Sequence, residues 1–200
     1  LLESTGVVGS EGAGGKYSSL AGFREVGAGA GATLTDNDGN IIQTAMLISK
    51  VPGRQTVPRA EAWAFYCVLN QWHGNKYVTI VVDATYATNG MKTGNRRTFI
   101  EGVNADIWNL IYARWDLLEI KPRIVKIKSH AIALQAYHRR YPLSWLYANE
   151  AADIVADVSD DHLGDFEEVA KANKEIRGIQ YAVCMRLSVV EHHMRSLWGS

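Results

Sequence analysis

A short β-branched run near the middle of the chain constrains the fold most strongly. Val78-Thr79-Ile80-Val81-Val82 shows no alternation of polar and apolar residues, which is typical of a strand buried on both faces. The run ends at Asp83. A carboxylate in that place must be paired, cap the next helix or bind a metal ion, because an isolated buried carboxylate is heavily penalised. Position alone favours the helix cap over the metal ligand and leaves both open.

Strands are also predicted before this run. Val7 and Val8 form a short apolar start that could lie at an edge of the sheet, and a glycine-rich loop follows from Glu11 to Lys16. A strong hairpin signal, Asp36-Asn37-Asp38-Gly39, then separates two further stretches. We expect these stretches to form antiparallel strands at about 26–35 and 41–49.

Helices follow the strands in the predicted order. Apolar residues recur at helical spacing from Pro58 to Trp72, and proline suits a first helical turn. Other helices are expected at 85–91, 105–118 and 148–158, with a strand at 123–129 and one or two more helices between 165 and 197. This order predicts a mixed α/β domain over 1–160 with a C-terminal helical extension over 161–200.

The composition indicates a globular chain with no strong overall field. Its 200 residues are 47% hydrophobic, and Lys+Arg and Asp+Glu both total 21. Binding to nucleic acid would therefore need local patches of charge. No apolar run approaches the roughly 20 residues that cross a bilayer, so we expect a soluble protein without a membrane partner. Cys67 and Cys184 are expected as reduced thiols, which favours an intracellular location.

Other acidic and basic residues have ordinary explanations when each is taken alone. Glu61 near the start of a helix complements the helix dipole. Glu150, Asp153 and Asp157 share a helix face, which is usually a solvated stripe, although nearby alanines would let that helix lie close to a sheet. His130 after a predicted strand would usually be exposed.

Four short motifs change these interpretations when they are read in order. They are Gln55-Thr56-Val57-Pro58-Arg59-Ala60-Glu61, Val81-Val82-Asp83-Ala84-Thr85-Tyr86, Lys126-Ile127-Lys128-Ser129-His130-Ala131 and Asn149-Glu150-Ala151-Ala152-Asp153. Together they resemble the ribonuclease H family, in particular the versions in retroelement polyproteins and related eukaryotic domains. The resemblance spans roughly Gly6 to Asp157.

The resemblance implies both a fold and an activity. The fold would be a five-stranded mixed sheet, the first three strands antiparallel, flanked by helices. The activity would be hydrolysis of the RNA strand of RNA–DNA hybrids by a two-metal mechanism with Mg²⁺, or Mn²⁺ as a substitute, leaving a 5′-phosphate and a 3′-hydroxyl. Four carboxylates would be the metal ligands and catalytic residues, with His130 assisting proton movement or product release: Glu11, Glu61, Asp83 and Asp153.

The sequence departs from the family pattern at Glu11. The family has Asp followed by a small pair at this place in its first strand, whereas Glu11-Gly12-Ala13 has a side chain longer by one methylene. Catalytic geometry is held within about half an ångström in a good site. An alternative function therefore stays open, that of a catalytically impaired nucleic-acid-binding or scaffold module of a larger polyprotein.

Substrate contacts are expected around the carboxylates. The shape, phosphates and 2′-hydroxyls of a hybrid would be recognised rather than its sequence. The expected contacts are Gly12, Thr56, Arg59 and Thr85. A basic cluster of Lys92, Arg96 and Arg97 could hold phosphates further along, and a solvated loop is an equal alternative. The run Gly27-Ala28-Gly29-Ala30-Gly31-Ala32 fits a dinucleotide fingerprint in spacing but leads into a hairpin turn, so a close-packed strand explains it better.

Overall fold

A computed structural model describes residues 6–14, 26–35, 41–72, 77–128 and 141–158. The chain divides into two compact units, Leu1–His162 and Leu163–Ser200. All described residues belong to the first unit. The helices expected at 165–197, and Cys184, lie outside the described residues, so the predicted C-terminal extension stays a prediction.

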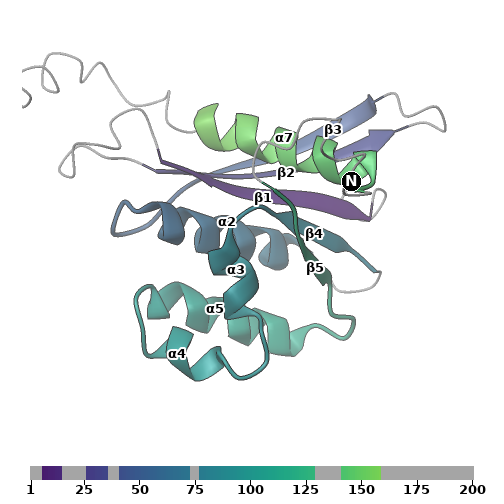
Figure 1. The fold of residues 1–200 in the computed structure, drawn as a ribbon. Helices are drawn as coiled ribbons and strands as arrows, with labels where there is room; N and C mark the ends of the chain where they lie inside the picture. The colour runs from purple at the N-terminus through teal and green to yellow at the C-terminus, as the bar shows by residue number, and fades with distance from the viewer. Residues whose placement is uncertain (1–5, 15–25, 36–40, 73–76, 129–140, 159–200) are drawn as a thin grey trace, which may run out of the picture. The chain divides into compact units, whose positions relative to one another are not determined.

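Five strands form one mixed sheet in the order β3-β2-β1-β4-β5 (Figure 1). β1 pairs antiparallel with β2 and parallel with β4, β2 pairs antiparallel with β3, and β4 pairs parallel with β5. The strands are β1 (Val7–Ala13), β2 (Gly27–Thr35), β3 (Ile41–Lys50), β4 (Thr79–Val82) and β5 (Arg123–Lys126). The predicted five-stranded mixed α/β fold is confirmed.

The expectation for the first strand was wrong in two respects. β1 lies at the centre of the sheet rather than at an edge. It also continues to Ala13, so Glu11 is a strand residue, as the family resemblance implied, and not part of the loop that the glycine-rich run predicted. The small residues after Val8 resemble a loop in sequence. They form a strand because both faces of the sheet are covered there, and all residues from Val8 to Gly12 are buried.

Helices cover both faces of this sheet (Figure 1). α7 packs on β1 and β2 on one face, whereas α2 packs on the other face and contacts α3 and α5. The helices are α2 (Val57–Gln71), α3 (Thr85–Gly90), α4 (Arg96–Ile100), α5 (Ala105–Leu117) and α7 (Leu143–Val158). None of the described helices is long and apolar enough to cross a membrane.

Two helical features were missed by the sequence pattern. α7 begins five residues before the expected start at Ala148, with the N–H of Trp145 bonded to the carbonyl of Pro142 at 3.0 Å. α4 has only five residues and buries none of them, so it has no apolar periodicity to detect. The helices expected at 58–72, 85–91 and 105–118 are confirmed with end shifts of one residue.

The main core lies between the sheet and α2 and α5. Phe65 and Leu69, one turn apart on α2, are both 0% exposed. They share a cluster with Ile80 of β4 and Trp108 of α5. Burial of each such side chain contributes about 1.5–3 kcal/mol. This core fixes the positions of α2, which carries Glu61, and of β4, which ends directly before Asp83.

On the other face, glycines of the sheet lie directly against alanines of α7. A β-carbon at Gly9 would lie 2.0 Å from the carbonyl oxygen of Ala148, and one at Gly29 would lie 2.5 Å from that of Ala152. No side chain larger than hydrogen fits between the two backbones. The run 27–32 is thus a close-packed strand, as expected, and α7 is held where Asp153 reaches the centre of the sheet.

Candidate metal centre

Three carboxylates from three separate elements converge beside the central strand. Glu11 belongs to β1, Glu61 to α2, and Asp83 directly follows β4. Each offers an oxygen atom, and these atoms all lie within 4.8 Å of one another. Glu11 and Glu61 are 8% and 6% exposed. The structure therefore brings together three of the four carboxylates that the sequence named.

Close contact between β1 and α2 places Glu61 in this group. A β-carbon at Gly12 would lie 2.4 Å from the backbone nitrogen of Glu61, so only glycine permits this approach. Glu61 is the fifth residue of α2, and the first turn of α2 holds no acidic residue. The helix-dipole explanation for Glu61 is therefore wrong, because that effect falls off within the first turn.

Asp83 does not act as a helix cap. The N-cap of α3 is Ala84, and no side chain makes a capping hydrogen bond there. The helix-cap interpretation, which position alone favoured, is therefore wrong. A carboxylate oxygen of Asp83 instead lies within 4.8 Å of an oxygen of each of the two glutamates, an arrangement that suits a metal ligand.

The electrostatics of the group favour a bound cation. Burial, the largest cause, and the charges of Asp83 and Asp153 together raise the pKa of Glu61 to about 8, against hydrogen bonds from Glu11 and from the backbone of Gly12 that lower it. Burial also raises the pKa of Glu11, as do the charges of Glu61 and Asp83. Neighbouring carboxylates in a buried site cannot all ionise without compensation. When no cation is bound, protons on the carboxyl groups reduce the repulsion between them.

Two oxygen atoms of the group have no hydrogen-bond partner. The Oε2 atoms of Glu11 and Glu61 are both buried and unpaired. Buried polar atoms without partners are rare and costly in folded proteins, and a bound ion is one accepted explanation for them. The donor set consists of carboxylate oxygens alone, which suits a hard cation such as Mg²⁺. These observations fit the implied metal.

Asp153 approaches the group from the opposite face of the sheet. It lies on α7 and is half-buried, and its Oδ2 accepts a 3.3 Å hydrogen bond from Nδ2 of Asn149. Asp153 and Glu11 line one open pocket together with Gly12, Ala13, Gly14 and Asp157. Asp157 was assigned only to a solvated stripe, so its place in this pocket was missed. The i, i+4 spacing from Asp153 was the available signal.

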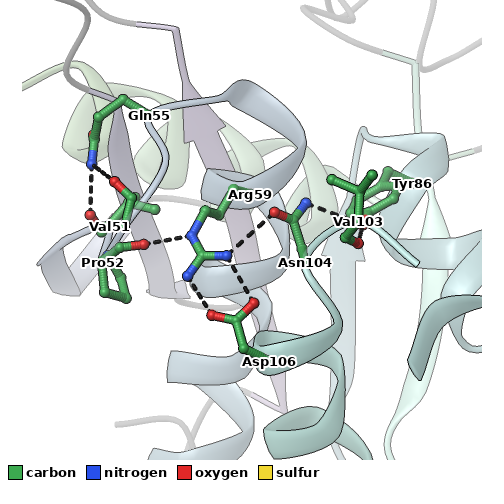
Figure 2. Close-up of polar contacts among 9 residues, drawn as sticks. Val51, Pro52, Gln55, Arg59, Tyr86, Val103, Asn104 and Asp106 are labelled. Carbon is green, nitrogen blue, oxygen red and sulfur yellow. Dashed lines mark hydrogen bonds and ion pairs between the residues drawn. The ribbon is translucent and has the colours of Figure 1, made fainter. Parts of the chain in front are cut away.

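Arg59, expected as a substrate contact, is already bonded within the protein. It is 7% exposed and donates to the carbonyl of Pro52, to Oδ1 of Asn104 and, through two nitrogens, to both carboxylate oxygens of Asp106 (Figure 2). The guanidinium of Arg59 is therefore held by partners within the protein, and its expected contact with substrate stays a prediction. No local sequence pattern predicts these bonds, because Asn104 and Asp106 lie more than 40 residues away along the chain.

The other expected contacts have mixed surroundings. Thr85 is exposed at the start of α3, and Thr56 is half-buried at the N-cap of α2. Gly12 lines the pocket. Because it has no side chain, the backbone of α2 can pack directly against it. His130 lies outside the described residues.

The side chains of the basic cluster near α4 already have hydrogen-bond partners within the protein. Arg96 bonds both oxygens of Asp116 at 3.1 and 2.6 Å, and Arg97 bonds Glu101 at 3.0 Å. Lys92 bonds Oδ1 of Asn89 at 2.7 Å. Phosphate binding here would have to compete with two surface ion pairs, each of which is worth little.

Comparison with known proteins identifies the fold but no close relative. No family model matches the sequence, and no curated protein matches it. The solution structure of the PFV RNase H domain has a TM-score of 0.55 at 14% identity, over 79% of this chain and 95% of that chain. The crystal structure of Prototype Foamy Virus protease-reverse transcriptase has a TM-score of 0.57 at 14% identity, over 80% of this chain and 21% of that chain. The chain thus has a ribonuclease H-like fold, as its resemblance implied.

Proposed function

We propose that this chain is a metal-dependent endonuclease that hydrolyses the RNA strand of RNA–DNA hybrids. The observation that carries the proposal is the convergence of Glu11, Glu61 and Asp83 within 4.8 Å, in a ribonuclease H-like fold. Fold alone does not fix function, so the proposal depends on this group of side chains.

The residues present divide into two sets of ligands for two ions, which we propose to be Mg²⁺ with Mn²⁺ as a substitute. Glu11, Glu61 and Asp83 would hold one ion, and Glu11 with Asp153 would contact the second across the shared pocket. When bound, such ions lower the pKa of an attacking water and stabilise the charge on the leaving oxygen.

The protein's own contribution is to hold these side chains at fixed places. Glu11 and Asp83 are fixed by parallel pairing of β1 and β4, in which Ser10 lies opposite Val82. Glu61 is fixed by the contact of α2 with Gly12. Burial excludes water from two of the carboxylates, which strengthens their attraction for a cation. We assign His130 to proton movement or product release.

We propose that the substrate hybrid lies across the pocket beside Thr56 and Thr85. Threonine hydroxyls that solvent reaches can bond phosphates or sugar, which suits recognition by shape rather than by sequence. Other domains of a longer polypeptide would add contacts, because one solved structure of similar fold spans a protease-reverse transcriptase of which this chain matches 21%. The host setting is proposed to be a retroelement polyprotein inside the cell.

A second candidate is a binding or scaffold module that has lost efficient catalysis. It is favoured by Glu11, whose side chain is longer than that of the family's Asp. Such a module, with all its carboxylates present, would bind the hybrid without cleaving it.

A substrate panel tests the proposal. The full chain would be incubated with a labelled hybrid, duplex RNA and duplex DNA, each with Mg²⁺, Mn²⁺ or a chelator. We expect cleavage of the RNA strand of the hybrid alone, abolished by the chelator. Hybrid binding without cleavage under both metals would support the second candidate instead.

A further inference from the structure

Arg59 is the centre of a polar network that joins three helices (Figure 2). Its guanidinium bonds Asp106 at the start of α5 and Asn104 just before that helix. The Nδ2 atom of Asn104 donates to the hydroxyl of Tyr86 on α3 at 3.2 Å. We name these four residues, Arg59, Asn104, Asp106 and Tyr86, the Arg59 network.

The network joins the buried side chain of Arg59 to the carboxylate of Asp106, whose side chain is 63% exposed. Arg59 and Asp106 form a two-pronged ion pair in which the Arg59 side chain is 9% exposed. Asn104 is buried and has a φ of 64°, a left-handed backbone conformation that asparagine tolerates better than most residues. The hydroxyl of Tyr86 also donates to the carbonyl of Val103 at 3.0 Å and accepts from Nε1 of Trp108 at 3.0 Å.

Two members of the network lie close in sequence to a metal-centre carboxylate. Arg59 is two residues before Glu61 on α2, and Tyr86 is three residues after Asp83. The described contacts tie Glu61 to Asp83 in two ways. One is the sheet, and the other is this bridge through α5 and α3.

We propose that Arg59 and Asp106 are positioning residues for the metal centre. They hold the first turn of α2 against the start of α5 and, through Asn104, against α3, so that Glu61 and Asp83 stay within reach of one cation. This inference rests on the proposed function. Such positioning is needed because the carboxylates of the metal centre carry like charges and repel one another.

The inference is tested on Asp106 with a matched control on the same helix. Asp106→Ala removes the bidentate partner of Arg59, whereas Asp116→Ala removes the bidentate partner of Arg96 at the exposed end of α5. Binding of Mn²⁺ to the full chain would be measured by calorimetry, at a temperature where circular dichroism shows every variant folded. The Mg²⁺ dependence of hybrid cleavage, with kcat and KM, would be measured in parallel.

We expect Asp106→Ala to weaken Mn²⁺ binding by about tenfold, the lower end of the loss seen when partners that orient metal ligands are removed. The Mg²⁺ concentration for half-maximal cleavage should rise in step, kcat at fixed Mg²⁺ should fall, and KM for the hybrid should stay within about twofold. Asp116→Ala should match wild type in Mn²⁺ affinity and in the Mg²⁺ concentration for half-maximal cleavage. If Asp106→Ala does not fold, Asp106→Asn, which keeps the shape of the side chain, takes its place with the same expectation.

If wild type and Asp106→Ala bind Mn²⁺ with equal affinity, the inference is overturned and the proposed function is unaffected. Wild-type protein that neither binds Mn²⁺ nor cuts hybrid would overturn the proposed function, and the inference with it. Wild-type protein that binds Mn²⁺ without cutting would contradict the nuclease proposal alone, and the comparison of affinities would still decide the role of Arg59.

Discussion

Glu11 of the central strand and Glu61 of the helix packed against it each bury one carboxylate oxygen that no hydrogen-bond donor reaches. Two unpaired acceptors side by side, with Asp83 beside them, are costly in a protein that binds nothing. The pair therefore makes the stability of the chain depend on protons and cations.

The first prediction concerns the pH dependence of stability without metal. The pKa of Glu61 in the folded chain is about 8, against an ordinary value of 4.5. A carboxyl whose pKa is raised on folding binds its proton more tightly in the native state, so its contribution is full below about pH 4.5 and is lost as the pH rises through about 8. Thermal unfolding in chelator should therefore show falling stability across that window.

Glu61→Gln isolates this contribution. We expect the variant to lose less stability over the same pH range and to gain less melting temperature from added Mg²⁺ than wild type. Asp116→Asn, at an exposed ion pair, serves as the control. A wild-type stability that is flat from pH 5 to 8 in chelator would contradict the assigned pKa direction.

The second prediction concerns the seam between β2 and α7. Gly29→Ala would place a β-carbon 2.5 Å from backbone atoms of Ala152 and Ala156, which cannot move without shifting the helix. We expect a loss of about 1–3 kcal/mol in the free energy of unfolding, measured by denaturant titration. Met46→Ala, at a residue 55% exposed on β3, should change it by less than about 0.5 kcal/mol. Equal losses in the two variants would show that the seam is not tightly packed.

The third prediction concerns the departure from the family pattern. Glu11 already reaches Glu61 and Asp83 from its place in β1, so the strand is adapted to the longer side chain. Glu11→Asp should withdraw the carboxylate by about one bond length and lower Mg²⁺-supported cleavage by about ten- to a hundredfold, since a misplacement of about 1 Å can cost that much. Single-turnover cleavage is the measurement. A rate that rises about tenfold would instead mark wild type as an impaired enzyme.

The fourth prediction concerns His130. If this residue acts in product release, His130→Ala should lower the steady-state rate more than single-turnover cleavage, because release limits only the former. Equal losses in both regimes would exclude that role.

Much of the fold could be predicted from the sequence because apolar patterns mark the buried elements. The helix from Val57 has apolar residues at helical spacing, and the strand before Asp83 is a continuous apolar run of the kind buried on both faces. β1 did not, because its residues after Val8 are small or charged and are buried on both faces by partners distant in sequence. Its central position could therefore be found only from the pairing of strands.

The residues of the candidate site could be predicted from the sequence, but the contacts that hold them in place could not. Glu11, Glu61 and Asp83 could be named from motif order, since each sits in a short recognisable run. The bonds of Arg59 to Asn104 and Asp106 depend on how α5 packs against α2, which no local pattern encodes. Arg59 consequently looked like a free cation in the sequence and proved to be a buried structural one.

The central claim is that the three converging carboxylates hold the metal ion that cuts the hybrid, and one comparison tests it most directly. RNA-strand cleavage of a hybrid with Mg²⁺ would be measured for wild type, Asp83→Asn and the control Asp116→Asn, all shown to be folded. The account predicts cleavage by wild type and Asp116→Asn, and loss of about a thousandfold or more in Asp83→Asn, since a ligand of the reacting centre is removed. Cleavage by Asp83→Asn at the wild-type rate would contradict it.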